Sequence, residues 1–133
     1  MKIAFLQLSD LHLQDNKGAH PAKIQAIVNS FATYAPFEGI VIVLSGDIAA
    51  TGEDNQYKIA STFLGRLVPA IQHQYAIREK NVKILIVPGN HDIDWGGKKR
   101  LDASAICAFT EDEKEKHLQN ELICMKNYFS FSS

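Results

Sequence analysis

Cysteine is scarce in this chain of 133 residues, which holds only Cys107 and Cys124. They lack the close pairing of a zinc site or a redox motif, so we interpret both as packed or idle thiols. No stretch is apolar for the length that a membrane-spanning helix needs. Near the start, Gln7, Ser9 and Asp10 interrupt the first apolar run too early for a signal peptide. We therefore expect a soluble protein of the reducing cytoplasm.

A large excess of charge of one sign is also missing, because 14 basic and 15 acidic side chains leave a net charge of −1. Such a balance gives no overall attraction to nucleic acid or to an acidic membrane. The basic run at 98–100 is interpreted as a solvated loop, with contact to a nucleic-acid backbone as the alternative. The length and the hydrophobic fraction of 46% fit one globular domain over residues 1–133. Its core motifs are expected within 3–95, and a variable helical segment over 101–130.

Three short apolar runs rich in β-branched residues predict buried strands, at residues 3–8, 40–44 and 84–87. Each run is followed by polar side chains, and Pro88 and Gly89 end the third run abruptly. The segments between the runs have helical periodicity, which makes the three strands parallel. Parallel strands joined by right-handed crossovers share one carboxyl edge, where ligands bind in open α/β sheets.

The connecting segments predict two crossover helices and a further helix near the end of the chain. The first begins at Pro21 and ends near Tyr34. The second begins near 51–54, where Thr51 or Asp54 can cap it, and continues to Tyr75 with a kink or a break expected at Pro69. Residues 95–97 read as a loop and 101–109 as a short helix. A capping box at 110–113 begins the last helix, which continues to Phe129.

The polar side chains that follow the three strands should lie close together at the shared edge. The residues expected to converge are Asp10, His12, Asp47, Asn90 and His91. The carboxylates of Asp10 and Asp47, placed side by side, would repel each other by roughly 4 kcal/mol at ~4 Å and an effective dielectric of ~20. A bound cation removes that cost, so the pattern favours a metal site.

Three patterns, each placed after a predicted strand, resemble those of the calcineurin-like metallophosphoesterases: Asp10-x-His12, Gly46-Asp47 and Gly89-Asn90-His91-Asp92. The nearest likeness is to the bacterial class III cyclic-nucleotide phosphodiesterases, in which a Gly-Asp-Ile pattern precedes a Gly and a Tyr, here Gly52 and Tyr57. The resemblance covers residues 3–95. It implies an α/β fold: the parallel βαβαβ half of the family's β-sandwich, with flanking helices and here an extra C-terminal helix.

The resemblance also implies a dinuclear site that holds two divalent metal ions, with manganese, iron and zinc as the metals. The implied site residues are Asp10, His12, Asp47 and Asn90 as metal ligands, with His91 and Asp92 as catalytic residues. Asp47 would bridge the two ions, and His91 would act on the substrate phosphate with Asp92 orienting it. Carboxylate and imidazole suit these metals, which lower the pKa of bound water from ~15.7 to around 7 and so provide a nucleophile.

One departure from the family pattern concerns the histidines that family members add from later segments. After His91 this sequence holds only His117, without the accompanying glycine, before Ser133. The chain therefore resembles the first half of a phosphoesterase domain, either as a fragment or as a shortened relative. Half of a β-sandwich leaves a sheet face uncovered, so we expect self-association, a C-terminal remainder of the domain, or cover by the C-terminal helix.

The function expected from the resemblance is metal-dependent hydrolysis of a phosphodiester or a phosphomonoester, with nucleotides among the substrates. Two alternatives remain open at this point. One is a metal-dependent nuclease, which uses the same ions. The other is a catalytically incomplete regulatory or interaction module that retains half of the metal site. A phosphoprotein phosphatase is less favoured, because residues 48–57 resemble the nucleotide branch more closely.

Overall fold

The computed structural model describes residues 2–15, 21–94, 96 and 107–133. The basic run at 98–100 and most of the short helix expected over 101–109 lie outside these residues. So does Trp95 in the expected loop.

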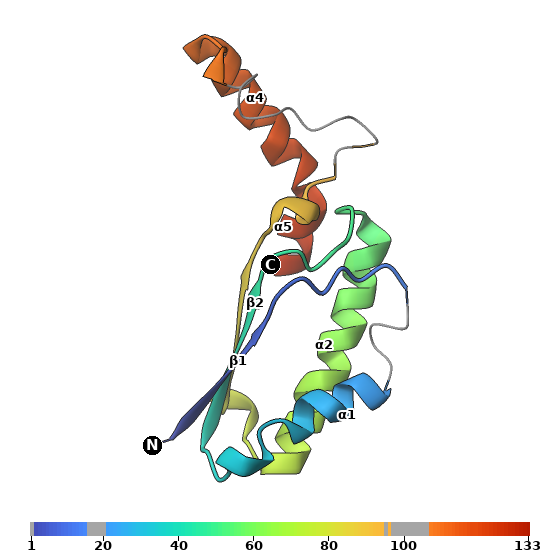
Figure 1. The fold of residues 1–133 in the computed structure, drawn as a ribbon, viewed down its shortest axis with the longest axis vertical. Helices are drawn as coiled ribbons and strands as arrows, with labels where there is room; N and C mark the ends of the chain where they lie inside the picture. Colours follow the sequence, from blue (N-terminus) through green and yellow to red (C-terminus); the bar gives the residue numbers. More distant parts are fainter. Residues whose placement is uncertain (1, 16–20, 95, 97–106) are drawn as a thin grey trace.

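A three-stranded parallel sheet forms the centre of the domain (Figure 1). Its strands are β1 (Ile3–Leu8), β2 (Gly39–Ser45) and β3 (Val82–Val87), and β2 lies in the middle. In the register, Ile42 of β2 pairs with Leu6 on one side and with Ile84 on the other. The predicted parallel α/β fold is confirmed, because all three strands occur where the apolar runs are.

Two helices connect the strands and cover one face of the sheet (Figure 1). They are α1 (Pro21–Asn29), followed by a 3-10 turn at Ala32–Tyr34, and α2 (Asp54–Tyr75). The sheet directs Ile40, Ile42 and Leu44 into the core that these helices complete, and each of the three is at most 1% exposed. Burying such side chains contributes about 1.5–3 kcal/mol each. The Tyr75 hydroxyl donates to the Val28 carbonyl at 2.6 Å, which joins α2 to α1.

Helix α2 differs from the prediction in two respects. It runs through Pro69 as one helix, so a break at Pro69 is wrong, whereas the alternative expectation of a kink stays a prediction. Pro69 removes a helical hydrogen bond at a cost of ~3 kcal/mol, but Leu67 and Ile71 on either side of it are fully buried and keep the helix on the sheet. The N-terminal cap is Glu53 without a side-chain hydrogen bond, so neither Thr51 nor Asp54 caps the helix.

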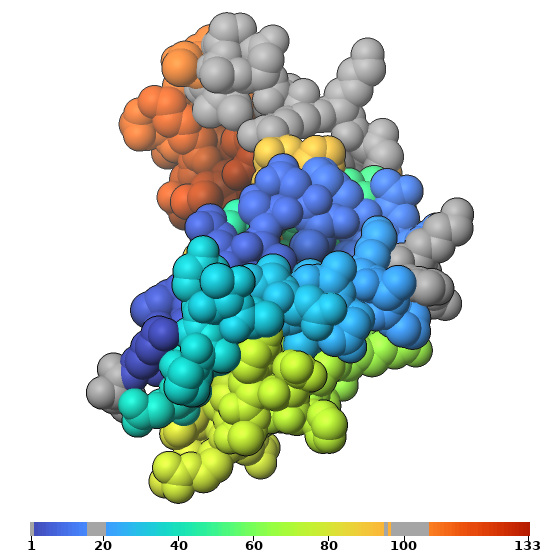
Figure 2. Space-filling view, turned by 60° about the horizontal axis from the view of Figure 1, so that its bottom comes forward, coloured from blue at the N-terminus to red at the C-terminus, as the bar shows by residue number. Residues whose placement is uncertain are grey.

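The C-terminal segment forms two helices, α4 (Glu111–Cys124) and α5 (Lys126–Ser132), so the prediction of one helix continuing to Phe129 is wrong. The predicted capping box is confirmed: Thr110 Oγ1 accepts from the Glu113 backbone, and Glu113 Oε2 accepts from the Thr110 backbone at 2.7 Å. Helix α5 packs against α2 through the buried Tyr128, whereas α4 projects beyond the sheet and its helices (Figures 1 and 2). Within the described ranges, no helix combines the length and hydrophobicity needed to cross a membrane.

The second face of the sheet is open among the described residues. Phe5 of β1 is 72% exposed and Leu85 of β3 is 57% exposed, although both belong to strands of the central sheet. Helix α5 packs against α2 and α4 projects beyond the sheet, so the expected cover by the C-terminal helix is wrong. Self-association and a C-terminal remainder of the domain stay predictions.

Candidate metal centre

The loops that follow β1 and β2 run side by side and continue the parallel pairing of the two strands. The Asp10 backbone donates to the Gly46 carbonyl at 3.2 Å, and the His12 backbone donates to the Asp47 carbonyl at 3.0 Å. A bridge between Leu13 and Ala49 ends this extension. The pairing brings the residues of the first motif next to Asp47 of the second.

Three of the predicted site residues have left-handed backbone conformations. The φ angles are 54° at Asp10, 43° at His12 and 52° at Asp47. Side chains disfavour this region, and such conformations persist where the surrounding structure imposes them, often at functional sites. Here the hydrogen bonds between the two loops provide that constraint. The unusual backbone is therefore concentrated in the residues that the motifs single out.

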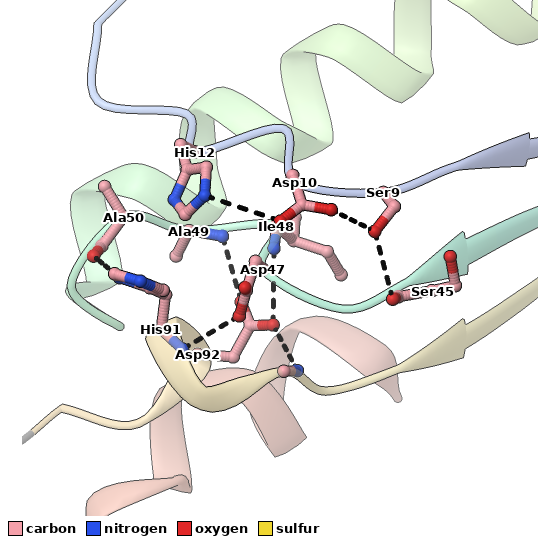
Figure 3. A network of polar contacts seen from close by, with 11 residues as sticks. Ser9, Asp10, His12, Ser45, Asp47, Ile48, Ala49, Ala50, His91 and Asp92 are labelled. Carbon is pink, nitrogen blue, oxygen red and sulfur yellow. Dashed lines mark hydrogen bonds and ion pairs between the residues drawn. The ribbon is translucent and has the colours of Figure 1, made fainter.

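The carboxyl edge of the sheet gathers nitrogen and oxygen donors (Figure 3). His12, Asp47 and His91 each offer one ligand atom, and these three atoms lie within 4.8 Å of one another. The His12 and His91 rings meet edge to face at 4.6 Å between centroids. Asp10 Oδ1 lies 3.9 Å from His12 Nε2. Imidazole and carboxylate groups at such spacing fit manganese, iron or zinc, so the donor set is suitable for a divalent ion.

His91 is fixed by two hydrogen bonds. Its backbone donates to Asp47 Oδ1 at 2.9 Å, which ties the third motif to the second. Its ring Nδ1 lies 2.8 Å from the Ala50 carbonyl. A carbonyl oxygen only accepts, so Nδ1 carries the proton and Nε2 is the ring nitrogen left for a metal or a substrate. Asn90 is exposed and immediately precedes His91 in a 3-10 turn (Asn90–Asp92).

Asp92 lies beneath the site and is fully buried. Its Oδ1 accepts from the Ala49 backbone at 2.9 Å, and its Oδ2 accepts from the backbones of Ile48 at 3.3 Å and Gly89 at 2.8 Å. These donors come from the loops after β2 and β3, so one carboxylate holds the two loops together (Figure 3). The carboxylate thus serves the backbone of the loops, while Asp10, His12, Asp47 and His91 form the cluster above it.

Tyr57 and Gln56 in the first turns of α2 support the same loops, although the sequence motifs assign neither of them a role in the site. The Tyr57 hydroxyl lies 3.0 Å from the Asp92 carbonyl and 3.1 Å from Asp92 Oδ1. Burial raises the pKa of Tyr57, and the neighbouring Asp92 charge raises it further. The motif resemblance includes Tyr57 by position, but no pattern in the sequence indicates its partner. For Gln56 the sequence offers no signal beyond a polar residue on the inward side of a helix.

Two glycines allow the loops to approach each other closely. A Cβ atom at Gly89 would lie 2.1 Å from Asp47 Oδ1, so any side chain there would displace the site carboxylate. Gly52 has a φ of +71°, and a Cβ atom there would lie 2.5 Å from the Asp94 backbone nitrogen. The second and third motifs therefore fit together only with glycine at these positions.

A parallel α/β sheet that collects metal-type donors at its carboxyl edge is typical of a metal-dependent α/β enzyme. Residues 3–131 match the family model of the calcineurin-like phosphoesterases, and the chain belongs to this family. Its class is therefore that of the metallophosphoesterases, which are phosphoric ester hydrolases. The match extends past residue 95, where the sequence resemblance ends, and includes α4 and most of α5. No curated protein matches the chain.

Proposed function

We propose that this chain forms the metal-binding part of a dinuclear phosphoesterase that hydrolyses a phosphodiester or a phosphomonoester. The observation that carries the proposal is the cluster of His12, Asp47 and His91 at the carboxyl edge of the sheet. The proposed metal ligands are Asp10, His12, Asp47 and Asn90, with Asp47 shared between two ions. Divalent ions supply Lewis acidity: they lower the pKa of bound water to around 7 and neutralise phosphate oxygens.

The proposed roles of the protein groups follow from their contacts. His91 acts from Nε2, because Nδ1 is engaged with the Ala50 carbonyl. In its protonated form this nitrogen donates to the leaving oxygen, a contribution of typically 10² to 10⁴-fold. Asp92 acts as a positioning residue, because its carboxylate holds the loops that carry Asp47 and His91.

For the substrate we propose a nucleotide phosphodiester. The support is the arrangement of Gly52 and Tyr57, the two residues that the nucleotide branch shares with this chain. Gly52 lies so close to the backbone after the third motif that an added Cβ atom would lie 2.5 Å from the Asp94 nitrogen, and Tyr57 donates to Asp92 within the motif. Both residues therefore belong to the framework of the site. The two free cysteines suit a cytoplasmic location.

Calorimetric titration of the chain with Mn²⁺ tests the metal site. We expect Asp47→Asn to weaken the Mn²⁺ affinity at least about tenfold. Removing only a group that hydrogen-bonds to a metal ligand already lowers metal affinity about 10–100-fold. The amide of the variant still accepts the backbone hydrogen bond from His91, so the loop is preserved. Glu79→Gln is the matched control, because Glu79 is exposed and precedes β3 at the opposite end of the sheet. Equal affinities for wild type and Asp47→Asn would refute the assignment.

Turnover distinguishes the proposed hydrolase from its rivals. Chromogenic phosphodiesters and phosphomonoesters, a cyclic nucleotide and single-stranded DNA are offered to the Mn²⁺-loaded protein. For His91→Ala we expect retained metal and a loss of turnover of 10²-fold or more. Hydrolysis of DNA without hydrolysis of the nucleotide would favour the nuclease, and metal binding without any turnover would favour the non-catalytic module.

A further inference from the structure

Gln56 is a buried amide whose hydrogen bonds all go to one short loop. It lies in the first turn of α2 and is 6% exposed. Its Oε1 accepts from the backbones of Ala50 and Thr51, each at 2.9 Å. Its Nε2 donates to Thr51 Oγ1 at 2.8 Å. The side chain therefore clamps the loop between β2 and α2 at residues 50 and 51.

Ala50 connects this clamp to the metal centre. Its backbone nitrogen is held by Gln56, and its carbonyl lies 2.8 Å from His91 Nδ1. One peptide group of Ala50 is therefore bound by the side-chain amide of Gln56, and the following peptide group is bound by the imidazole of His91. Because the carbonyl accepts only, it stabilises the ring form with the proton on Nδ1 and the lone pair on Nε2.

We propose that Gln56 is a positioning residue, which acts through Ala50 to hold His91 in the Nδ1-protonated tautomer. Asp92 holds the same loop at Ile48 and Ala49 and leaves Ala50 to Gln56. A buried hydrogen bond of ordinary strength corresponds to about tenfold in the ratio of two states. The tautomer is a property of the chain itself, whereas its effect on catalysis rests on the proposed function.

The tautomer is measured without metal or substrate, on the full chain with ¹⁵N-labelled histidine in the presence of a chelator. Long-range ¹H–¹⁵N spectra distinguish the two tautomers, and a pH about two units above the ordinary histidine pKa of ~6.5 keeps the ring neutral. The signal of His91 is assigned by its disappearance in His91→Ala. For the wild type we expect the proton on Nδ1. A wild-type ring with its proton on Nε2 would overturn the proposal.

Matched variants of Gln56 test the clamp. Gln56→Met keeps the size and removes the acceptor, so the tautomer ratio should move about tenfold toward Nε2. Gln56→Glu restores acceptor oxygens and should restore the wild-type tautomer. Gln74→Met makes the same exchange at an exposed site of the same helix and should change nothing. An unchanged ratio in folded Gln56→Met contradicts the proposal.

A milder variant covers the case in which Gln56→Met does not fold. Thr51→Val removes the exposed hydroxyl that orients the Gln56 amide, so the ratio should move in the same direction by a smaller factor. If Gln56→Met does not fold, an unchanged tautomer ratio in Thr51→Val overturns the proposed clamp.

A kinetic comparison links the clamp to the proposed function. With Mn²⁺-loaded protein, Gln56→Met should lower kcat while KM and metal affinity stay within about twofold, because the amide touches neither metal nor substrate. If the tautomer shifts as expected but Mn²⁺ does not bind even to wild type, the proposed function fails and the clamp stands. If Mn²⁺ binds but the tautomer does not respond, the clamp alone fails.

Discussion

Replacing Asp92 with asparagine should destabilise the domain far more than an ordinary loss of one charge. The carboxylate is fully buried and accepts four hydrogen bonds, from the backbones of Ile48, Ala49 and Gly89 and from the hydroxyl of Tyr57. Asparagine has the same shape but offers one acceptor oxygen. Whichever way the amide turns, its NH₂ group replaces an oxygen that now accepts from a backbone N–H.

The magnitude follows from the best orientation of that amide. With its oxygen in the place of Oδ2, the amide still accepts from Ile48 and Gly89, and the Tyr57 hydroxyl can donate to the Asp92 carbonyl at 3.0 Å. The Ala49 N–H is then left unpaired, which costs about 1–3 kcal/mol, and the remaining bonds lose their charge. Together we expect a loss of about 3–5 kcal/mol, a large part of a typical domain stability of 5–15 kcal/mol.

Urea denaturation followed by far-ultraviolet circular dichroism measures this loss at neutral pH. The matched control is Asp54→Asn, whose exposed carboxylate pairs with Lys58 at 2.6 Å on the surface of α2. Surface pairs of this kind contribute roughly 0–1 kcal/mol, so the control should denature almost as the wild type does. A loss below about 1 kcal/mol for Asp92→Asn would show that the carboxylate does not hold the loops together, and would refute the reasoning.

Three further predictions concern neighbouring features. The Tyr57 phenol ionises near pH 10 in the unfolded chain, and burial raises its pKa in the folded protein. Its contribution to stability is therefore complete below pH ~10 and is lost as the pH rises above that value. Tyr57→Phe should flatten this alkaline fall of the urea midpoint, and an unaltered fall would contradict the prediction. Gly52→Ala should destabilise the domain by more than about 2 kcal/mol, because its Cβ would meet the Asp94 backbone at a positive φ. Gly65→Ala, in open space within α2, should stabilise it by about 0.5–1 kcal/mol. Equal urea midpoints for the two variants would disprove the close approach of Gly52 to Asp94. On the sheet, Phe5→Ser should cost less than about 1 kcal/mol while Leu6→Ala costs about 2 kcal/mol or more, and equal costs would mean that the outer face is covered in solution.

The sequence was sufficient to predict the sheet and the edge at which the site lies. Apolar runs bounded by Gly46 and by Pro88 and Gly89 mark strands, and helical periodicity between them requires a parallel arrangement. Those two properties place the polar residues after each strand at one edge of the sheet. There the ligand atoms of His12 and Asp47 lie within 4.8 Å of each other. Local patterns were enough here because topology converts a position along the chain into a position on the sheet.

Other features depend on contacts between segments far apart in the sequence, and the tertiary structure alone decides them. The direction in which Asp92 points depends on backbone donors 43 and 44 residues away, and the proton on His91 depends on a carbonyl 41 residues away. Continuous packing on both sides of Pro69 likewise preserves a helix that local propensity would break. Residue type and periodicity determined which groups reach the edge of the sheet. Which of them cluster at the candidate metal centre, and which hold the loops from beneath, was decided by hydrogen bonds and packing between loops that no local pattern encodes.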